Sequence, residues 1–299
     1  MESISIVIGC YNQGPFIGEA IESALAQTSP ACEILVVDDG STDHTEQVVG
    51  RYSDVRYIRQ TNQGLLGVTR NRGIKETTGT YVVFLDGDDR LLPDHLEKSL
   101  KAFQKRPNAA VVCGLFRIFG EQKGTVSHTC DPADSYGTVI RFPSIAHILT
   151  AMFKRSILAQ AGNFRADRAI NGCEDFELFL RLAQRYSVYC HHELVAEYRF
   201  HRNQMTKNPG RMLRSAMSAY RSQRHYIRKN PQYMEDYFRS RIFYQDFWGQ
   251  LSLEQLAASA RGAEIRVALR YVLTLLRFYP GGLLHRIYQK ATKMALNKR

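Results

Sequence analysis

The sequence predicts an α/β protein in which a mostly parallel sheet carries helices on both faces and is followed by a region of helices alone. Three observations predict this fold class. In the first 200 residues, short runs that are apolar on both faces alternate with segments of helical spacing. Two of the four early apolar runs end in clusters of aspartate. Beyond about residue 205 the spacing is helical throughout, with many Arg, Tyr and Leu residues.

The elements of the first half follow from apolar spacing and from residues that begin helices. Ser41 and Asp43 are typical helix caps, and Pro93 suits the first turn of a helix. Ligands of such sheets bind at the carboxyl ends of the strands, so both aspartate clusters should lie on one rim. We expect strands at residues 3–8, 33–37, 55–59 and 81–85, and helices at 16–25, 45–51, 65–77 and 93–105.

The second half of the sheet region is less regular, and it contains a loop rich in Gly, Asp and Pro. In the later helical region, the stretch Pro280-Gly281-Gly282 should separate two helices, the second at 283–296. The chain is therefore expected to form two domains, 1–205 and 206–299. Within the first domain we expect further strands at 109–119 and 188–198, and further helices at 154–161 and 175–186.

The formal net charge of +11 is unevenly distributed along the chain. Residues 201–299 hold 19 basic and 5 acidic side chains, a net charge of +14, whereas residues 1–200 have a net charge of −3. The last third should therefore seek an anionic surface. From Arg266 to Arg299, basic and apolar residues alternate without an acidic one, which suits a helix in an anionic membrane interface. The alternatives are a solvated helix packed on the first domain and a contact between two copies.

Composition excludes several classes of protein. With 44% hydrophobic and 23% charged residues, the chain is neither disordered nor fibrous. Its six cysteines form no C-x-x-C pair and fit no zinc site, so we expect buried free thiols and a reducing compartment. We expect neither a signal peptide nor a transmembrane helix. These observations predict a cytoplasmic protein, peripheral on the inner face of the membrane if the basic region binds lipid; they leave the oligomeric state open.

The stretch Asp86-Gly87-Asp88-Asp89 is the sharpest chemical feature. Three carboxylates within four residues repel one another unless they are solvated or neutralised by a divalent cation. Mg²⁺ and Mn²⁺ bind few protein carboxylates and fill the remaining positions with phosphate oxygens and water. A D-x-D sequence at the end of a strand therefore suits a metal–diphosphate site. The alternative is a solvated turn with capping aspartates.

Two other acidic segments carry candidate residues. Asp38 or Asp39, at the end of the second strand, can accept hydrogen bonds from a nucleobase; the alternative is a capped helix start. Asp175 follows Glu174 at the start of a helix with a strongly apolar face. A carboxylate there can act as a general base, or it can simply be stabilised by the helix dipole.

Histidines provide weaker signals. His201 lies between Arg199 and Arg202, which suit a phosphate group, although a lone histidine is most often structural. His191 and His192 fall in an expected strand and should point to opposite faces rather than share a metal.

These segments occur in the order seen in family 2 glycosyltransferases, and residues 4–205 resemble that family. The runs VVDDGSTD, YVVFLDGDD and EDFELFLRL are the most specific matches, and residues 149–164 resemble the acceptor side of the family. The resemblance implies the GT-A fold, a Rossmann-like sheet, in a catalytic domain at 1–205. It also implies an inverting enzyme that transfers a sugar from a nucleotide diphosphate, a UDP-sugar, to an acceptor hydroxyl. The matching segments are 4–13, 36–43, 62–71 with Gly73, 81–89 and 172–182.

The resemblance further implies a role for each candidate residue. Asp175 would remove the acceptor proton, Asp88 would hold Mg²⁺ or Mn²⁺, and His201 resembles a late histidine near the diphosphate in some members. Gly9 and Cys10 stand where the family usually has a proline and a small hydroxyl residue, so altered base or ribose contacts are expected. Tyr11 would border the nucleotide base, and Asp38 would form a hydrogen bond with it. Arg70 would approach the nucleotide or its phosphates, and Asp86 would face the ribose.

The implied acceptor is a saccharide or a lipid-linked molecule in cell-surface polysaccharide or glycolipid synthesis. A sugar-phosphate nucleotidyltransferase is the nearest alternative, but residues 9–14 lack the basic residue of its usual Gly-rich loop. A non-catalytic nucleotide-sugar-binding relative is disfavoured because Asp88 and Asp175 are both present. The G-x-G-x-x-G pattern of NAD-binding proteins is absent there, and no recognised nucleic-acid motif occurs, so no nucleic-acid partner is expected.

Overall fold

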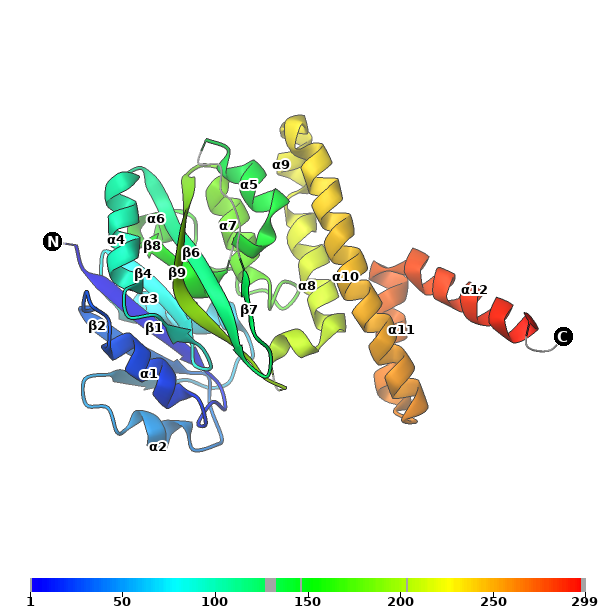
Figure 1. Cartoon of the computed structure of the whole chain (residues 1–299), viewed down its shortest axis with the longest axis horizontal. Coiled ribbons are helices and arrows are strands. Elements are labelled where there is room, and N and C mark those ends of the chain that lie inside the picture. Colours follow the sequence, from blue (N-terminus) through cyan, green and yellow to red (C-terminus); the bar gives the residue numbers. More distant parts are fainter. Residues whose placement is uncertain (1, 127–132, 146, 203, 297–299) are drawn as a thin grey trace. The chain divides into compact units, whose positions relative to one another are not determined.

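The structure is a computed structural model of the chain that describes residues 2–126, 133–145, 147–202 and 204–296. The chain divides into two compact units: unit 1 is Met1–Arg202 and unit 2 is Asn203–Arg299 (Figure 1).

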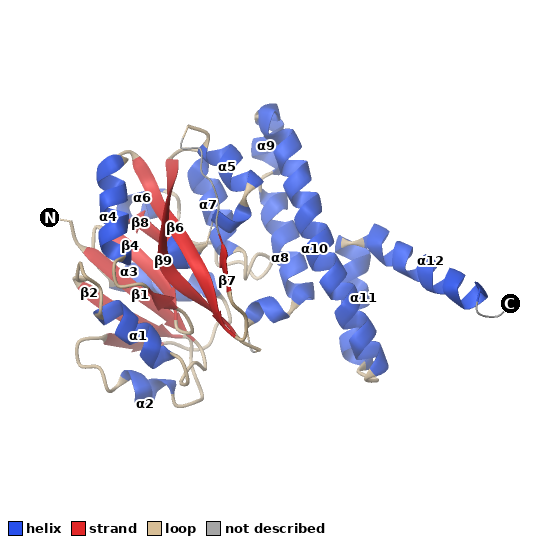
Figure 2. Cartoon of the chain, viewed as in Figure 1, coloured by secondary structure: helices blue, strands red, loops and turns tan. Residues whose placement is uncertain are grey.

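Unit 1 is built on a sheet that has nine strands in the described residues (Figure 2). The order along the sheet is β3-β2-β1-β4-β8-β6-β9-β5, and β7 pairs with β6. The strands are β1 (Ile4–Cys10), β2 (Glu33–Asp38), β3 (Arg56–Arg59), β4 (Tyr81–Asp86), β5 (Arg90–Leu91), β6 (Ala109–Gly120), β7 (Gly124–Val126), β8 (Ala151–Lys154) and β9 (Ser187–Phe200).

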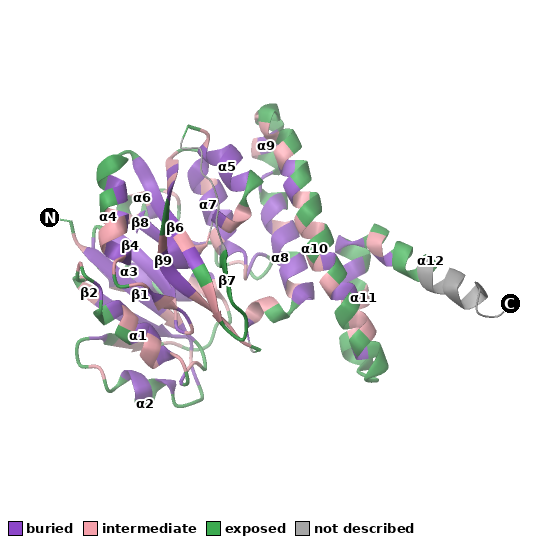
Figure 3. Cartoon of the chain, viewed as in Figure 1, coloured by how far each residue is buried: buried purple, intermediate pink, exposed green. Residues whose placement is uncertain are grey.

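The first four strands form the parallel part of the sheet. β1 lies between β2 and β4 and runs parallel to both, and β3 extends the sheet beyond β2. Almost every residue of β1, β2 and β4 is buried because helices cover both faces of the sheet there, as Figure 3 shows. β3 lies at the edge of the sheet, and its Arg56 and Arg59 are exposed. Beyond β4 the sheet is mixed: β8 is antiparallel to β4 and β6, whereas β9 is parallel to β6. The predicted α/β fold is confirmed, but the sheet is mixed rather than mostly parallel, since four of the eight strand pairings in the described residues are antiparallel.

Helices cover both faces of the sheet in unit 1. One face packs β1, β2 and β4 against α1, α2 and α4 in a single apolar cluster. On the other face α3 contacts β1 and β2, and α5 and α7 contact β9. The helices are α1 (Ile17–Leu25), α2 (Thr45–Val49), α3 (Leu66–Glu76), α4 (His95–Lys105), α5 (Ser135–Arg141), α6 (Arg155–Gln160) and α7 (Glu174–Ala183).

The strands and helices that the sequence predicted are present, but β5, β7, β8 and α5 were not predicted. All four are short, and periodicity is weakest in short elements. β8 pairs with both β4 and β6, so this missed strand joins the two halves of the sheet.

The expectation of buried free thiols is confirmed for four cysteines and is wrong for Cys32, which is exposed. Cys130 lies outside the described residues. On β9, His191 is buried and His192 is exposed, as the predicted alternation requires. The buried free cysteines are Cys10, Cys113, Cys173 and Cys190.

Unit 2 consists of helices, as its spacing predicts. Two helices meet here as predicted, but the break falls at Tyr279, and the stretch Pro280-Gly281-Gly282 that was expected to separate them forms the first turn of the second helix. In the described residues no helix is long and apolar enough to cross a membrane. The α-helices are α8 (Pro209–Ser222), α9 (Arg224–Lys229), α10 (Met234–Arg261), α11 (Ile265–Phe278) and α12 (Pro280–Leu296).

Candidate active site

The candidate site lies at the carboxyl ends of β1, β2 and β4. Asp38 pairs with Cys10 at the end of β2, and Asp86 pairs with Gly9 at the end of β4, so the predicted common rim is confirmed. The N–H of Gly87 donates to the carbonyl of Gly9 at 3.0 Å, and a Cβ at Gly87 would lie 3.1 Å from the Cβ of Cys10. Glycine is therefore needed where the β4 turn approaches β1. We call this edge the acidic rim, made of Asp38, Asp39, Asp86, Asp88 and Asp89.

Asp38 is fully buried and is held by donors from its own unit. Its Oδ1 accepts from the N–H of Ser41 at 2.8 Å and from the hydroxyl of Ser41 at 2.6 Å, while Oδ2 accepts from the Tyr57 hydroxyl at 2.7 Å. Burial, with this bond to Asp38, raises the pKa of Tyr57. The predicted capping role of Ser41 is wrong, whereas Asp43 does accept from the N–H of Thr45, the first residue of α2. A contact between Asp38 and a nucleobase requires this turn to open, and it stays a prediction.

The neighbouring Asp39 fixes the loop that precedes α3. Its carboxylate accepts from the Gln60 side chain at 2.7 Å and from the backbone N–H groups of Gln63 and Gly64 at 3.0 and 2.9 Å. Asn171 donates to the carbonyl of Gly64 at 2.6 Å, which ties the same loop to the segment before α7. Asp39 therefore shapes the site through the backbone.

The loop after β1 exposes Tyr11, whose residue surface is 48% accessible. The next residue, Asn12, donates its N–H to the Ser41 hydroxyl at 2.8 Å and accepts from the N–H of Thr42 at 2.7 Å. Asn12 also adopts a positive φ of 52°, a conformation that asparagine tolerates better than most residues. These bonds hold the loop so that the Tyr11 ring remains available to a ligand.

Arg70, on α3, joins two acidic residues that are distant in sequence. Its side chain is 4% exposed, and it pairs with Asp86 at 3.0 Å and with Glu174. Burial opposes the charge of Arg70, but Asp86 and Glu174 hold its pKa above the usual value. The guanidinium also lies over the Phe164 ring, 5.6 Å from its centroid. Arg70 therefore supplies a single positive charge that two carboxylates share.

Asp175 is half-buried at the first turn of α7, next to this ion-pair cluster. Burial raises the pKa of Asp175 to about 7, the negative charge of Glu174 adds to the rise, and Arg70 opposes it. One of its oxygens accepts from the N–H of Phe176 at 2.7 Å. A carboxylate with a pKa near neutrality can hold and release a proton at physiological pH.

Asp88 and His201 form a second group at the acidic rim. The Nε2 atom of His201 lies 3.0 Å from Oδ2 of Asp88. Arg199, near the end of β9, donates to the carbonyl of Asp88 and through its N–H to Asp89, both at 2.7 Å. Asp89 is buried, and burial together with the charge of Asp88 raises its pKa well above the usual value. β9 thus places His201 beside the D-x-D turn.

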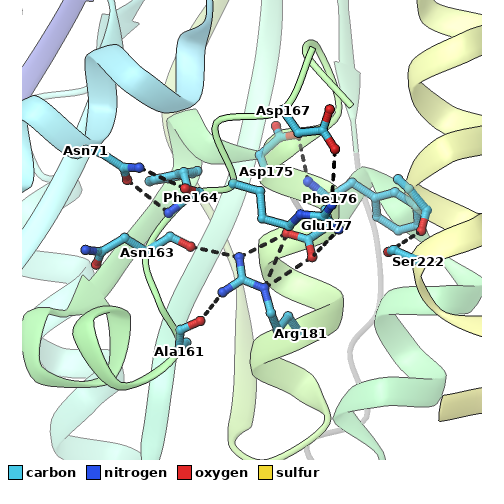
Figure 4. Close-up of polar contacts among 12 residues, drawn as sticks. Asn71, Ala161, Asn163, Phe164, Asp167, Asp175, Phe176, Glu177, Arg181 and Ser222 are labelled. Atoms are coloured by element: carbon cyan, nitrogen blue, oxygen red, sulfur yellow. Dashed lines mark hydrogen bonds and ion pairs between the residues drawn. The ribbon is translucent and has the colours of Figure 1, made fainter. Parts of the chain in front are cut away.

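The segment between α6 and α7 is fixed by two polar side chains (Figure 4). Arg181 pairs with Glu177 at 2.9 Å and donates to the carbonyl of Asn163 at 2.8 Å. Asn71, on α3, donates to the carbonyl of Phe164 at 2.8 Å and accepts from its N–H at 3.0 Å. These contacts tie α3 and α7 together, so Arg70 and Asp175 keep their relative positions.

The structure brings together most of the predicted site residues in two groups. Arg70, Asp86 and Asp175 gather around Glu174, and Asp88 gathers with His201. The pairing of Arg70 with Glu174 was not predicted, because 104 positions separate the two residues, and the hydrogen bonds from Arg199 were not predicted either. Among the described residues, no three His, Cys, Asp or Glu side chains form a group that could hold a metal.

Comparison with known proteins assigns the chain to a family. A family model described as Glycosyl transferase family 2 matches residues 5–162. The chain belongs to this family. The prediction from the sequence is therefore confirmed, and family membership supports a role in glycosyl transfer.

Two bacterial relatives illustrate the family. An uncharacterized glycosyltransferase of Rickettsia prowazekii is 32% identical over 213 residues, which cover 68% of this family 2 chain and 65% of that protein. The chain thus spans just under two thirds of the length of this relative. A putative teichuronic acid biosynthesis glycosyltransferase of Bacillus subtilis, TuaG, is 27% identical over 227 residues, which cover 73% of this chain and 87% of that protein.

Solved structures confirm the fold. Residues 1–349 of S. aureus TarS in complex with UDP-GlcNAc align with a TM-score of 0.62 and 16% identity, covering 92% of this chain and 91% of that one. The mannosyltransferase PcManGT of Pyrobaculum calidifontis, in complex with GDP-Man and Mn²⁺, aligns with a TM-score of 0.61 and 19% identity, covering 99% and 80%. These likenesses support the predicted GT-A type of α/β fold for this family 2 glycosyltransferase.

Proposed function

We propose that this chain catalyses the inverting transfer of a sugar from a nucleoside-diphosphate donor to an acceptor hydroxyl. The observation that carries the proposal is Asp175, a half-buried carboxylate whose pKa is raised to about 7 beside the Arg70 ion-pair cluster at the acidic rim. Inversion by direct displacement needs one general base and no covalent intermediate. Asp175 can supply that base, and Glu174, paired with Arg70, helps to tune it.

The proposed chemistry at Asp175 is a single displacement. Its carboxylate accepts the proton of the acceptor hydroxyl while the acceptor oxygen forms a bond to the anomeric carbon. The bond from that carbon to the diphosphate oxygen breaks, and the electron pair leaves with the diphosphate. Because attack comes from the side opposite the leaving group, the anomeric configuration inverts.

The donor is proposed to occupy the acidic rim as a nucleoside-diphosphate sugar. The exposed Tyr11 can stack on the base, and Asp86, which ends β4, is placed to face the ribose. The complexes of TarS with UDP-GlcNAc and of PcManGT with GDP-Man support this donor class. We propose a UDP-sugar as the first choice. In this proposal Asp38 contacts the base only after the Ser41 turn opens, and Arg70, through its ion pair with Asp86, orients that carboxylate toward the ribose of the nucleotide.

A divalent cation is proposed to bind at Asp88 and His201, whose nearest side-chain atoms are 3.0 Å apart. A carboxylate oxygen and an imidazole nitrogen suit Mn²⁺ and are compatible with Mg²⁺, leaving coordination positions for diphosphate oxygens and water. When bound, the ion supplies charge neutralisation for the departing diphosphate. Arg199 bonds the Asp88 backbone and so orients that carboxylate.

The acceptor is proposed to be a saccharide or a lipid-linked molecule in cell-surface polysaccharide or glycolipid synthesis. The relative TuaG, named for teichuronic acid biosynthesis, supports this choice. The exposed residues Arg266 and Arg270 of α11 lie beside an exposed apolar stripe, which supports binding of unit 2 to an anionic membrane. The stripe consists of Ile265, Leu269, Leu273 and Leu276.

A donor screen tests the proposal. Thermal stability of the full chain is measured against a panel of nucleotide-sugars with and without Mn²⁺, and the product of the best donor is analysed by NMR. We expect stabilisation by one donor that is enhanced by Mn²⁺, and a product of inverted anomeric configuration. A retained configuration would contradict the mechanism. Donor binding without any transfer to saccharide or lipid acceptors would instead support a non-catalytic relative.

A further inference from the structure

Unit 2 contains a small cavity whose wall is dominated by arginine. Four helices contribute to it: α8 gives Arg221, α9 gives Arg224, α10 gives Arg241 and α11 gives Arg277. The buried side chain of Phe278 forms part of its apolar lining. The cavity has a volume of about 60 Å³. We call this site, with its four arginines, the arginine cavity.

The arginines of the cavity are not paired with acidic side chains in the described part of unit 2. No Asp or Glu belongs to its lining, and none of its four arginines forms an ion pair or a hydrogen bond with a carboxylate in the described part of unit 2. Other arginines of the same helices do have partners. Arg214, on α8, donates to the Thr274 hydroxyl at 3.0 Å, and Arg239, on α10, pairs with Glu235 at 2.7 Å. The cavity therefore concentrates like charges that the fold does not balance.

Converging guanidinium groups repel one another, and an anion that bridges them removes this cost. Each guanidinium presents a planar fork of N–H donors that matches the spacing of phosphate oxygens. The volume of the cavity also suits a phosphate group. A single water needs about 10–15 Å³ by the same measure, so a cavity of about 60 Å³ has room for roughly four oxygen atoms. The chemistry and the size both match a phosphate group.

We propose that the arginine cavity is a phosphate-binding site, separate from the acidic rim of unit 1. Its ligand is a phosphate group, carried either by a small soluble molecule or by a membrane lipid. Arg241 is half-buried, whereas Arg221, Arg224 and Arg277 are exposed. Arg241 is thus the most enclosed contact, and the other three guanidinium groups surround a phosphate that enters from solvent.

The primary test is calorimetric titration of the full chain with inorganic phosphate and with pyrophosphate, in EDTA. We expect saturable binding that Arg241→Gln and Arg277→Gln each weaken about tenfold or more, the order of one charge-assisted hydrogen bond. Arg228→Gln is the matched control, because Arg228 is an exposed arginine of α9 that does not line the cavity. Asp88→Ala should retain the binding, since Asp88 belongs to the acidic rim.

Vesicle sedimentation distinguishes the two sources of the phosphate. Phosphatidylcholine vesicles are compared with vesicles that also contain phosphatidylglycerol. If the ligand is a lipid headgroup, Arg241→Gln lowers sedimentation with the anionic vesicles and inorganic phosphate competes with them. If the ligand is soluble, the substitution changes phosphate binding alone. Absence of saturable phosphate binding by the unaltered chain, or equal weakening by Arg228→Gln and Arg241→Gln, would overturn the proposal.

Discussion

The acidic rim of unit 1 and the arginine cavity of unit 2 handle charge in opposite ways. At the rim, acidic side chains have partners inside the protein: Arg70 pairs with both Asp86 and Glu174, and Oδ2 of Asp88 lies 3.0 Å from Nε2 of His201. In the arginine cavity, four cations face one space with no carboxylate in its lining. Asp86 and Asp88 of the rim therefore have side-chain partners within unit 1 before any ligand arrives, whereas the four arginines of the cavity have no carboxylate in its lining.

These two arrangements of charge suit different functions. Buried charges beside a carboxylate can tune its pKa, as burial and Glu174 do for Asp175. Cations without a carboxylate partner, three of them exposed, instead attract an anion from a distance. The net charges of the two parts of the sequence, −3 for residues 1–200 and +14 for residues 201–299, follow the same division. Chemistry is accordingly proposed for unit 1 and anion binding for unit 2.

Asp88→Ala should have the largest effect on the acidic rim. Loss of this carboxylate removes the proposed metal ligand, and turnover should fall about a thousandfold, the order of several kcal/mol of charge stabilisation. Isothermal titration with Mn²⁺ and the donor checks whether metal-dependent donor binding falls in parallel. Asp94→Ala is the control, because Asp94 pairs with Lys98 away from the rim. Unchanged Mn²⁺ affinity in Asp88→Ala would remove Asp88 from the metal site.

Arg70→Met and Arg221→Met compare the two regions directly through stability. Arg70→Met leaves Glu174 buried without its cation, so the free energy of unfolding should fall by about 3–5 kcal/mol. Arg221→Met removes an exposed arginine of the arginine cavity and should change it by less than about 0.5 kcal/mol. Urea unfolding measures both values. Equal losses in the two variants would contradict the distinction between paired and unpaired charge.

The pH dependence of turnover should report Asp175. Only its ionised form accepts a proton, so kcat/KM should fall about tenfold per pH unit below a pKa of about 7. The effect on stability has a defined sign: because the folded pKa lies above the ordinary value near 4, the contribution of Asp175 is fully present below pH 4 and is lost as pH rises through 7. Asp175→Asn should therefore gain stability relative to the unaltered chain between these values.

The sequence allowed prediction of the sheet and of the acidic rim because both depend on local patterns. Apolar runs followed by Asp38 and Asp86 placed both residues on one edge, since parallel strands end together. The pairing of Arg70 with Glu174 could not be predicted, because it depends on how α3 and α7 pack. The burial of Asp38 could not be predicted either, since the Tyr57 hydroxyl that donates to its carboxylate comes from the next strand. Tertiary contacts, rather than residue types, set these roles.

The arginine cavity could not be located from the sequence either. The sequence revealed an excess of positive charge and favoured an anionic partner, but spacing alone did not indicate which arginines converge. Helices α8, α9, α10 and α11 bring their four arginines to one cavity. The net charge of the sequence thus predicts the sign of the partner's charge, and the fold identifies the candidate site where that partner binds.

The role of Asp175 as the general base is tested most sharply by the turnover of Asp175→Asn, measured together with its donor affinity. We expect kcat to fall about 10²–10⁴-fold, the usual contribution of a positioned general base, with unchanged binding of the donor. The acid limb of the pH profile should disappear with it. A kcat close to that of the unaltered chain would contradict the assignment of Asp175 as the base of an inverting transfer.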